Sequence, residues 1–167
     1  VVRTTRGEYR TTSVLLAIGR RGTPRKLGVP GEELPKVVYR LVDPDQYVGQ
    51  DLLVVGGGDS ALEAAASLAE NGSRSVTLSY RGDSFSRAKP KNRERIAAAE
   101  KAGRLRVLFS SEVRRIEPDR VVLASAGRDV DLSNNSVIVS AGGVLPAGFL
   151  RGVGIEWNVG PEGATSA

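Results

Sequence analysis

A run of three glycines between a short apolar strand and an amphipathic helix restricts the fold of this sequence most. Residues Leu52–Val55 are all aliphatic, which is typical of a buried strand. Gly56-Gly57-Gly58 follows directly, and Asp59–Glu70 then places Ala61, Leu62, Ala65, Leu68 and Ala69 on one helical face. A buried strand that turns at once into such a helix predicts a β-α-β unit of a parallel sheet.

The residues from Gly56 to Ala61 have the spacing G-x-G-x-x-A, which is typical of turns that bind a dinucleotide. Gly56 permits the tight turn, Gly58 lets a pyrophosphate approach because it lacks a Cβ, and Ala61 lets the helix pack closely on the sheet. The first N–H groups of the helix, at Asp59 and Ser60, would face the phosphates. A glycine-rich turn without a ligand is the alternative, but the strand before it and the helix after it favour dinucleotide binding.

The remaining pattern extends this unit into an α/β fold. The predicted elements are strands at 75–80 and 105–109, a helix at 90–102, three short strands at 112–117, 120–124 and 128–132, and a buried strand at 137–140. The three short strands form an antiparallel meander where a second crossover helix would be expected. We therefore expect a Rossmann-like parallel sheet with an antiparallel β-meander crossover.

The flanking segments have weaker patterns. Residues 1–5 and 9–18 resemble strands joined by a turn at Arg6-Gly7-Glu8. Residues 19–50 are rich in proline and glycine and are predicted to connect two structural units. Near the C-terminus, Phe149-Leu150 is a short apolar element.

The second predicted strand ends at Tyr80, where a dinucleotide-binding unit contacts the adenosine ribose. Units specific for NAD place an acidic residue there, whereas a guanidinium suits a 2′-phosphate. Arg81 follows Tyr80, and Arg87 and Lys89 lie downstream, which favours NADPH over NADH. Asp83 could instead reach the ribose hydroxyls, so NADH stays open, and Arg81 could be a solvated loop residue.

Three further residues could contact the dinucleotide. Glu63 lies one turn into the first helix and either faces the nicotinamide or is an exposed helical glutamate. Gly142 and Gly143 follow the last buried strand, and ligands of open α/β sheets bind at the carboxyl ends of strands. This glycine pair either allows a close backbone approach or forms a plain turn.

The composition excludes several chemistries. The 167 residues include no cysteine and no histidine, so no thiolate or imidazole can act as nucleophile or base. The net charge of +5 is spread along the chain, which favours a solvated surface over nucleic-acid binding. No apolar run is long enough for a membrane helix, and we expect a cytoplasmic location. Because the sequence lacks methionine and begins on a strand-like segment, we expect a piece of a longer protein.

The sequence resembles the NAD(P)H-binding domain of two-domain flavoprotein reductases of the thioredoxin-reductase type. The matching parts are Val54 to Glu63, Leu15 to Gly19 with Leu27 to Glu32, the meander, and Val137 to Pro146. The resemblance implies that NADPH binds here and that FAD is held elsewhere in the longer protein. It also implies three regions: 1–43 as partial flavin-domain strands and connector, 44–145 as the NAD(P)H-binding domain, and 146–167 as a segment returning to the flavin domain.

Two departures from thioredoxin reductases narrow the expected function. The family carries Cys-x-x-Cys near Tyr39-Arg40-Leu41-Val42, so reduction of thioredoxin by that dithiol is excluded here. The family has a second arginine after the strand, where this chain has Gly82. Arg87 lies one position away from the family's later arginine. The segment Tyr80-Arg81-Gly82 with Ser84-Phe85-Ser86 is more similar to cysteine-free relatives of the bacillithiol-disulfide-reductase and ferredoxin–NADP-reductase types.

These observations predict a module that presents NADPH to a flavin for hydride transfer, with no catalytic side chain of its own. We expect the dinucleotide and the flavin domain as partners, no nucleic acid and no membrane, and little activity from this chain alone. A homodimer of the longer protein stays open. The alternative is a non-catalytic Rossmann module that senses the redox state of the nicotinamide.

Overall fold

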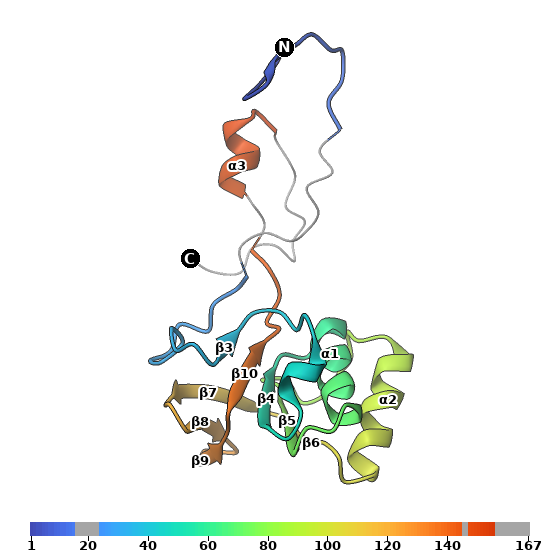
Figure 1. The fold of residues 1–167 in the computed structure, drawn as a ribbon, viewed down its shortest axis with the longest axis vertical. Coiled ribbons are helices and arrows are strands. Elements are labelled where there is room, and N and C mark those ends of the chain that lie inside the picture. The colour runs from blue at the N-terminus through green and yellow to red at the C-terminus, as the bar shows by residue number, and fades with distance from the viewer. Residues whose placement is uncertain (16–23, 145–146, 156–167) are drawn as a thin grey trace. The chain divides into compact units, whose positions relative to one another are not determined.

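The computed structural model describes residues 1–15, 24–144 and 147–155 (Figure 1). The chain divides into two compact units, which we call the first unit (residues 1–23 and 145–167) and the second unit (residues 24–144). The described elements are β1 (Val2–Thr4), β2 (Gly7–Tyr9), β3 (Val37–Val38), the 3-10 helix η1 (Pro44–Tyr47), β4 (Asp51–Val55), α1 (Asp59–Glu70), β5 (Ser75–Ser79), α2 (Pro90–Lys101), β6 (Arg106–Leu108), β7 (Ser111–Ile116), β8 (Arg120–Ser125), β9 (Arg128–Ser133), β10 (Ser136–Val139) and α3 (Ala147–Gly152).

The second unit is built on a five-stranded parallel sheet with the strand order β3-β10-β4-β5-β6. Helices α1 and α2 cover one face, and the meander β7-β8-β9 packs on the other (Figure 1). Along β4, Leu52 and Val54 join the core under the helices, whereas Leu53 joins the core under the meander. A strand buried on both faces must be apolar throughout, which explains the continuous aliphatic run in the sequence.

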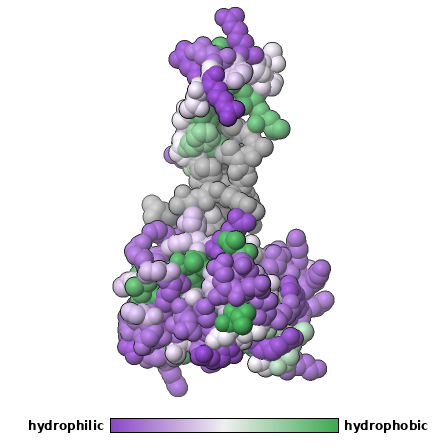
Figure 2. All heavy atoms as spheres, viewed as in Figure 1, coloured by the Kyte–Doolittle hydropathy of each residue, from purple (hydrophilic) through white to green (hydrophobic). Residues whose placement is uncertain are grey.

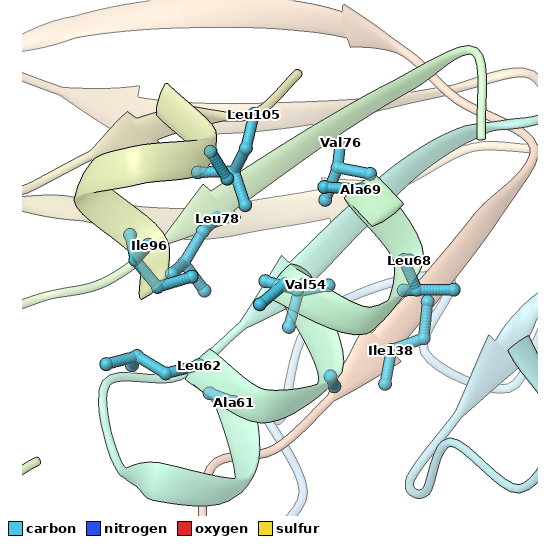
Figure 3. Close-up of a cluster of buried hydrophobic side chains, with 14 of the residues drawn as sticks. Val54, Ala61, Leu62, Leu68, Ala69, Val76, Leu78, Ile96, Leu105 and Ile138 are labelled. Carbon is cyan, nitrogen blue, oxygen red and sulfur yellow. The ribbon is translucent and has the colours of Figure 1, made fainter. Parts of the chain in front are cut away.

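Helix α1 has the predicted bounds and the predicted buried face. Figure 3 shows its side chains Ala61, Leu62 and Leu68 near Val54 and Ile138 of the sheet. These three helical residues are fully buried. The helix ends before Gly72, whose φ of +81° is the left-handed conformation that glycine adopts most easily. Together with the parallel sheet and the meander, these bounds confirm the predicted α/β fold with its meander crossover.

The N-terminal hairpin differs from the prediction. Gly7 and Glu8 were expected in a turn, but both lie in β2, and β2 ends at Tyr9. The turn lies one residue earlier because the hydroxyl of Thr4 accepts the N–H of Arg6 and donates to the carbonyl of Gly7, both at 3.1 Å. Residues 10–15 are not in a strand, and residues 16–18 of the predicted strand lie outside the described residues.

The stretch predicted as a connector contributes to the second unit. Strand β3 pairs in parallel with β10, so residues 24–43 belong to the same compact unit as the glycine turn. The sequence does not predict β3, because a strand of two residues has no periodicity. At the other end of the chain, Phe149-Leu150 lies in α3, which has no buried residue. Residues 145–146 and 156–167 lie outside the described residues.

The surface of the second unit is mostly polar. Figure 2 shows a largely hydrophilic face on which apolar residues form small, separate patches. Val42 and Val48 are the most exposed large apolar side chains in this unit, and scattered apolar residues of this kind are normal on protein surfaces. Within the described part of the chain, we find no helix with the length and apolar character needed to span a membrane.

Candidate dinucleotide-binding site

The first glycine of the turn is required by the packing of the fold. Gly56 has a φ of +145°, and a Cβ there would lie 2.4 Å from the carbonyl oxygen of Ser140 and 3.0 Å from the Cβ of Ala61. The turn is held in this position because the N–H of Gly56 donates to the carbonyl of Ser79 at 2.9 Å. The ends of β4, β5 and β10 therefore meet at Gly56, as expected for the carboxyl edge of a parallel sheet.

The third glycine faces open space. Gly58 is the N-cap of α1, and because it has no side chain it forms no capping hydrogen bond. A Cβ at this position would have no atom within 4 Å. Among the described residues, nothing accepts a hydrogen bond from the N–H groups of Gly57, Gly58, Asp59 or Ser60. Unpaired donors at the positive end of a helix suit an anion, and the space beside Gly58 is open to its approach.

The second glycine contacts an aromatic ring. A Cβ on Gly57 would lie 2.3 Å from the Cδ2 and Cε2 atoms of Tyr80, and one on Gly82 would lie 2.7 Å from its Cε1. The Tyr80 ring also stacks on Phe85, with ring centroids 5.7 Å apart. Tyr80 was a candidate cofactor contact, and the structure shows that its ring packs against the glycine turn itself. The motif allows any residue at the middle position, so it does not predict this contact.

The acidic candidates of α1 bind the start of α2. The Oδ1 of Asp59 accepts the backbone N–H of Lys89 at 2.8 Å and the side-chain amide of Asn92 at 2.7 Å. The same amide donates to Glu63 at 3.0 Å. The N–H of Lys89, followed by the amide of Asn92, holds the pKa of Asp59 below its usual value. Asn92 is 7% exposed, and sequence reasoning missed it because it resembles any polar residue on a helix.

The candidate phosphate-binding arginines lie in the loop between β5 and α2. Arg81 and Arg87 are both exposed. Arg81 lines a shallow hollow with Ser110, Glu112, Arg114 and the turn between β8 and β9. Within the described residues, neither Arg81 nor Arg87 makes an ion pair, so both guanidinium groups are available to an anion.

The glycine pair after β10 lies at the same edge of the sheet as the glycine turn. The carbonyl of Gly142 accepts the N–H of Arg25 at 3.0 Å, and Gly143 forms an isolated bridge with Pro24. This backbone pairing gives the two glycines a structural role, because it joins the first residues of the second unit to its last residues. The structure therefore brings the turn, Tyr80 and the glycine pair to one edge, with Arg81 and Arg87 on the neighbouring loop.

Comparison with known proteins places these features in a family. The family model described as pyridine nucleotide-disulphide oxidoreductase matches residues 1–163. Bacilliredoxin reductase Bdr of Bacillus subtilis is 32% identical over 158 residues, which are 93% of this chain and 48% of that protein. A ferredoxin–NADP reductase of Ignicoccus hospitalis is 44% identical over 92 residues, which are 55% of this chain and 30% of that protein.

Solved structures agree with the sequence matches. Bacillithiol disulfide reductase Bdr of Staphylococcus aureus has a TM-score of 0.76 and 30% identity, covering 82% of this chain and 42% of that one. Thioredoxin reductase of Lactococcus lactis has a TM-score of 0.69 and 30% identity, covering 78% and 45%. The predicted resemblance is confirmed, and the chain spans about half or less of the length of these relatives.

Proposed function

Since the chain belongs to the pyridine nucleotide-disulphide oxidoreductase family, we propose that it binds NADPH at the glycine turn and presents the nicotinamide to a flavin in a longer protein. The observation that carries this proposal is the set of unpaired N–H groups from Gly57 to Ser60 beside the open space at Gly58. The name of one relative, ferredoxin–NADP reductase, also supports NADP as the ligand.

In this proposal the chain contributes binding and orientation. The N–H groups of the turn hold the pyrophosphate, and the helix dipole of α1 favours its negative charge. Arg81 and Arg87 hold the 2′-phosphate of the adenosine ribose, since both are exposed cations on the loop that follows β5. When bound, the nicotinamide supplies a hydride to the flavin, and this step needs no acidic or basic side chain of the chain.

The substitution Gly58→Asp tests the proposed phosphate site without weakening the fold. Aspartate is a preferred N-cap residue, and Gly58 already has the extended backbone of an N-cap, with φ −94° and ψ 175°. The new carboxylate would bind the free N–H groups and repel the pyrophosphate. We expect an unchanged or higher thermal midpoint and a loss of NADPH affinity of at least about 100-fold in calorimetry, equivalent to about 2.7 kcal/mol.

A matched variant excludes a general effect of added negative charge. Gly103→Asp introduces the same charge directly after α2, where a Cβ would also meet no atom within 4 Å. Because Gly103 has a φ of +69°, this variant should lose about 1–2 kcal/mol of stability, but its affinity for NADPH should equal that of the original chain. Equal affinities of the Gly58→Asp variant and the original chain would overturn the proposed site.

A further inference from the structure

We propose that Asp59 is a positioning residue that sets the preference for NADPH over NADH by holding the β5–α2 loop against the glycine turn. The β5–α2 loop is defined here as residues 80–89. This inference rests on the proposed function and extends it to a residue that does not itself contact the 2′-phosphate. It explains why an acidic residue lies in the first turn of a helix that receives phosphates, where its charge alone would oppose them.

The loop is fixed at its first residue. The backbone of Tyr80 donates to the carbonyl of Leu108 at 2.9 Å and accepts the N–H of Ser111 at 3.1 Å. Its ring lies against Gly57 and stacks on Phe85. These contacts hold the loop start between the glycine turn and the segment after β6.

Asp59 fixes the last residue of the loop. Its carboxylate accepts the N–H of Lys89, and Asn92 in the first turn of α2 binds the same oxygen. Between the two anchors, Phe85 and Ala88 are buried. The loop is therefore tied to both sides of the phosphate-binding turn.

The exposed residues between the anchors carry the charges that discriminate the two nucleotides. Arg81 and Arg87 project from this segment and have no ion-pair partner among the described residues. A loop that is already ordered loses less conformational entropy when its arginines bind a phosphate. NADH lacks this phosphate, so release of the loop should weaken NADPH binding more than NADH binding.

The ratio of the two dissociation constants, Kd(NADH)/Kd(NADPH), isolates this effect. Both nucleotides contain the pyrophosphate, so any change in its repulsion by the carboxylate of Asp59 cancels in the ratio. Loss of repulsion of the 2′-phosphate would raise the ratio, which is opposite to the change expected here. We expect Asp59→Ala to lower the ratio at least fivefold at fixed salt concentration, because it removes both hydrogen bonds. Asp59→Asn keeps an acceptor oxygen and should retain most of the ratio.

Helix α1 offers a matched control. Glu70 is an acidic residue that binds Arg95 of α2, far along the helix from the loop. Glu70→Ala removes a contact between the same two helices but leaves the loop anchor intact. Its ratio should equal that of the original chain, which separates loop positioning from general loosening of α1 and α2.

Tryptic cleavage after Arg81 and Arg87 in the absence of nucleotide tests the anchor directly. We expect Asp59→Ala to be cut at least fivefold faster there, and Glu70→Ala and Asp59→Asn to be cut at nearly the original rate. If Asp59→Ala fails to fold, Asn92→Ala removes one of the two bonds and should shift both measurements less, in the same direction.

The outcomes distinguish this inference from the proposed function. If the original chain binds neither nucleotide, the proposed function fails, and this inference fails with it. If the chain binds NADPH and the Asp59→Ala ratio is unchanged, only the positioning role is overturned. If the ratio falls without faster cleavage, the loss of preference does not come from release of the loop, and the positioning role is also overturned.

Discussion

At the scale of single residues, the three glycines of the turn are glycine for three different reasons. Gly56 avoids the carbonyl of Ser140, Gly57 makes room for the Tyr80 ring, and Gly58 leaves open space where we propose that a phosphate binds. The motif predicts the first and third roles because they follow from a tight turn and a close phosphate. It cannot predict the second, because the partner of Gly57 comes from the end of another strand.

The Gly57→Ala substitution should therefore destabilise the protein through Tyr80. A Cβ at this position would overlap the ring, and overpacking of this kind costs about 1–3 kcal/mol. Urea denaturation measures the loss. In the Tyr80→Ala background the same substitution should cost less than half as much, because the ring is absent. An equal cost in both backgrounds would show that the backbone of Gly57, and not the ring, requires glycine.

Arg81→Ala should weaken NADPH by about 10- to 100-fold and leave NADH nearly unchanged, because a charge-assisted contact with phosphate contributes about 1.5–3 kcal/mol. Calorimetry with both nucleotides at fixed salt measures this difference. Arg93→Ala removes an exposed arginine from α2 and controls for net charge. Tighter binding of NADH than NADPH by the original chain would indicate that Asp83 governs the ribose site.

At the scale of elements, the sequence predicts long periodic segments well and short ones poorly. The bounds of α1 are matched, and no end of a meander strand differs from the predicted bound by more than one residue. The sequence did not predict strand β3, and it placed the turn of the N-terminal hairpin later than the structure does. A two-residue strand has its pairing partner in β10, and the hairpin turn depends on hydrogen bonds of Thr4, so neither is visible as a local pattern.

Two glycines in the segment before β3 test how this segment docks on the meander. Gly28 and Gly31 have φ angles of +72° and +83°, so alanine is strained at both positions. Only at Gly31 would the Cβ also overlap the carbonyl oxygen of Ile116. Gly28→Ala should cost about 1–2 kcal/mol. Gly31→Ala should cost about 1–3 kcal/mol more, measured by urea denaturation. Equal losses would mean that the segment does not dock on β7 in solution.

At the scale of the whole molecule, the second unit contains every candidate site residue and both apolar cores. The described strands and helix of the first unit contain no buried residue. Stability and nucleotide binding should therefore both be properties of the second unit. The assignment of residues 1–43 to partial flavin-domain strands and connector, and of residues 146–167 to a segment returning to the flavin domain, stays a prediction.

The acid sensitivity of this unit should depend on Glu32, which is 6% exposed. Burial raises the pKa of Glu32, but the N–H groups of Leu27 and Gly28 and the hydroxyl of Tyr39 lower it more, so the pKa lies below its usual 4.5. The charged form is therefore favoured in the folded state. Its stabilisation is present above pH 4.5 and is lost as the pH falls through the lowered pKa.

Glu32→Gln should reduce the free energy of unfolding at pH 7 by about 1–3 kcal/mol, because the charge is lost and one of the two backbone N–H groups loses its acceptor. The variant should also lose less stability than the original chain between pH 5 and pH 3. Urea denaturation across this range measures both effects. Glu94→Gln, at an exposed glutamate of α2, is the control and should follow the original curve. Identical pH curves for Glu32→Gln and the original chain would contradict the role of this carboxylate.

The central claim is that a dinucleotide binds at the N–H groups of the glycine turn. Backbone amide NMR of the chain during NADPH titration tests it most directly. We predict saturable shifts that are largest at Gly57, Gly58, Asp59 and Ser60, and their loss in the Gly58→Asp variant. Saturable binding with the largest shifts elsewhere, or no shift at millimolar NADPH, would contradict the account.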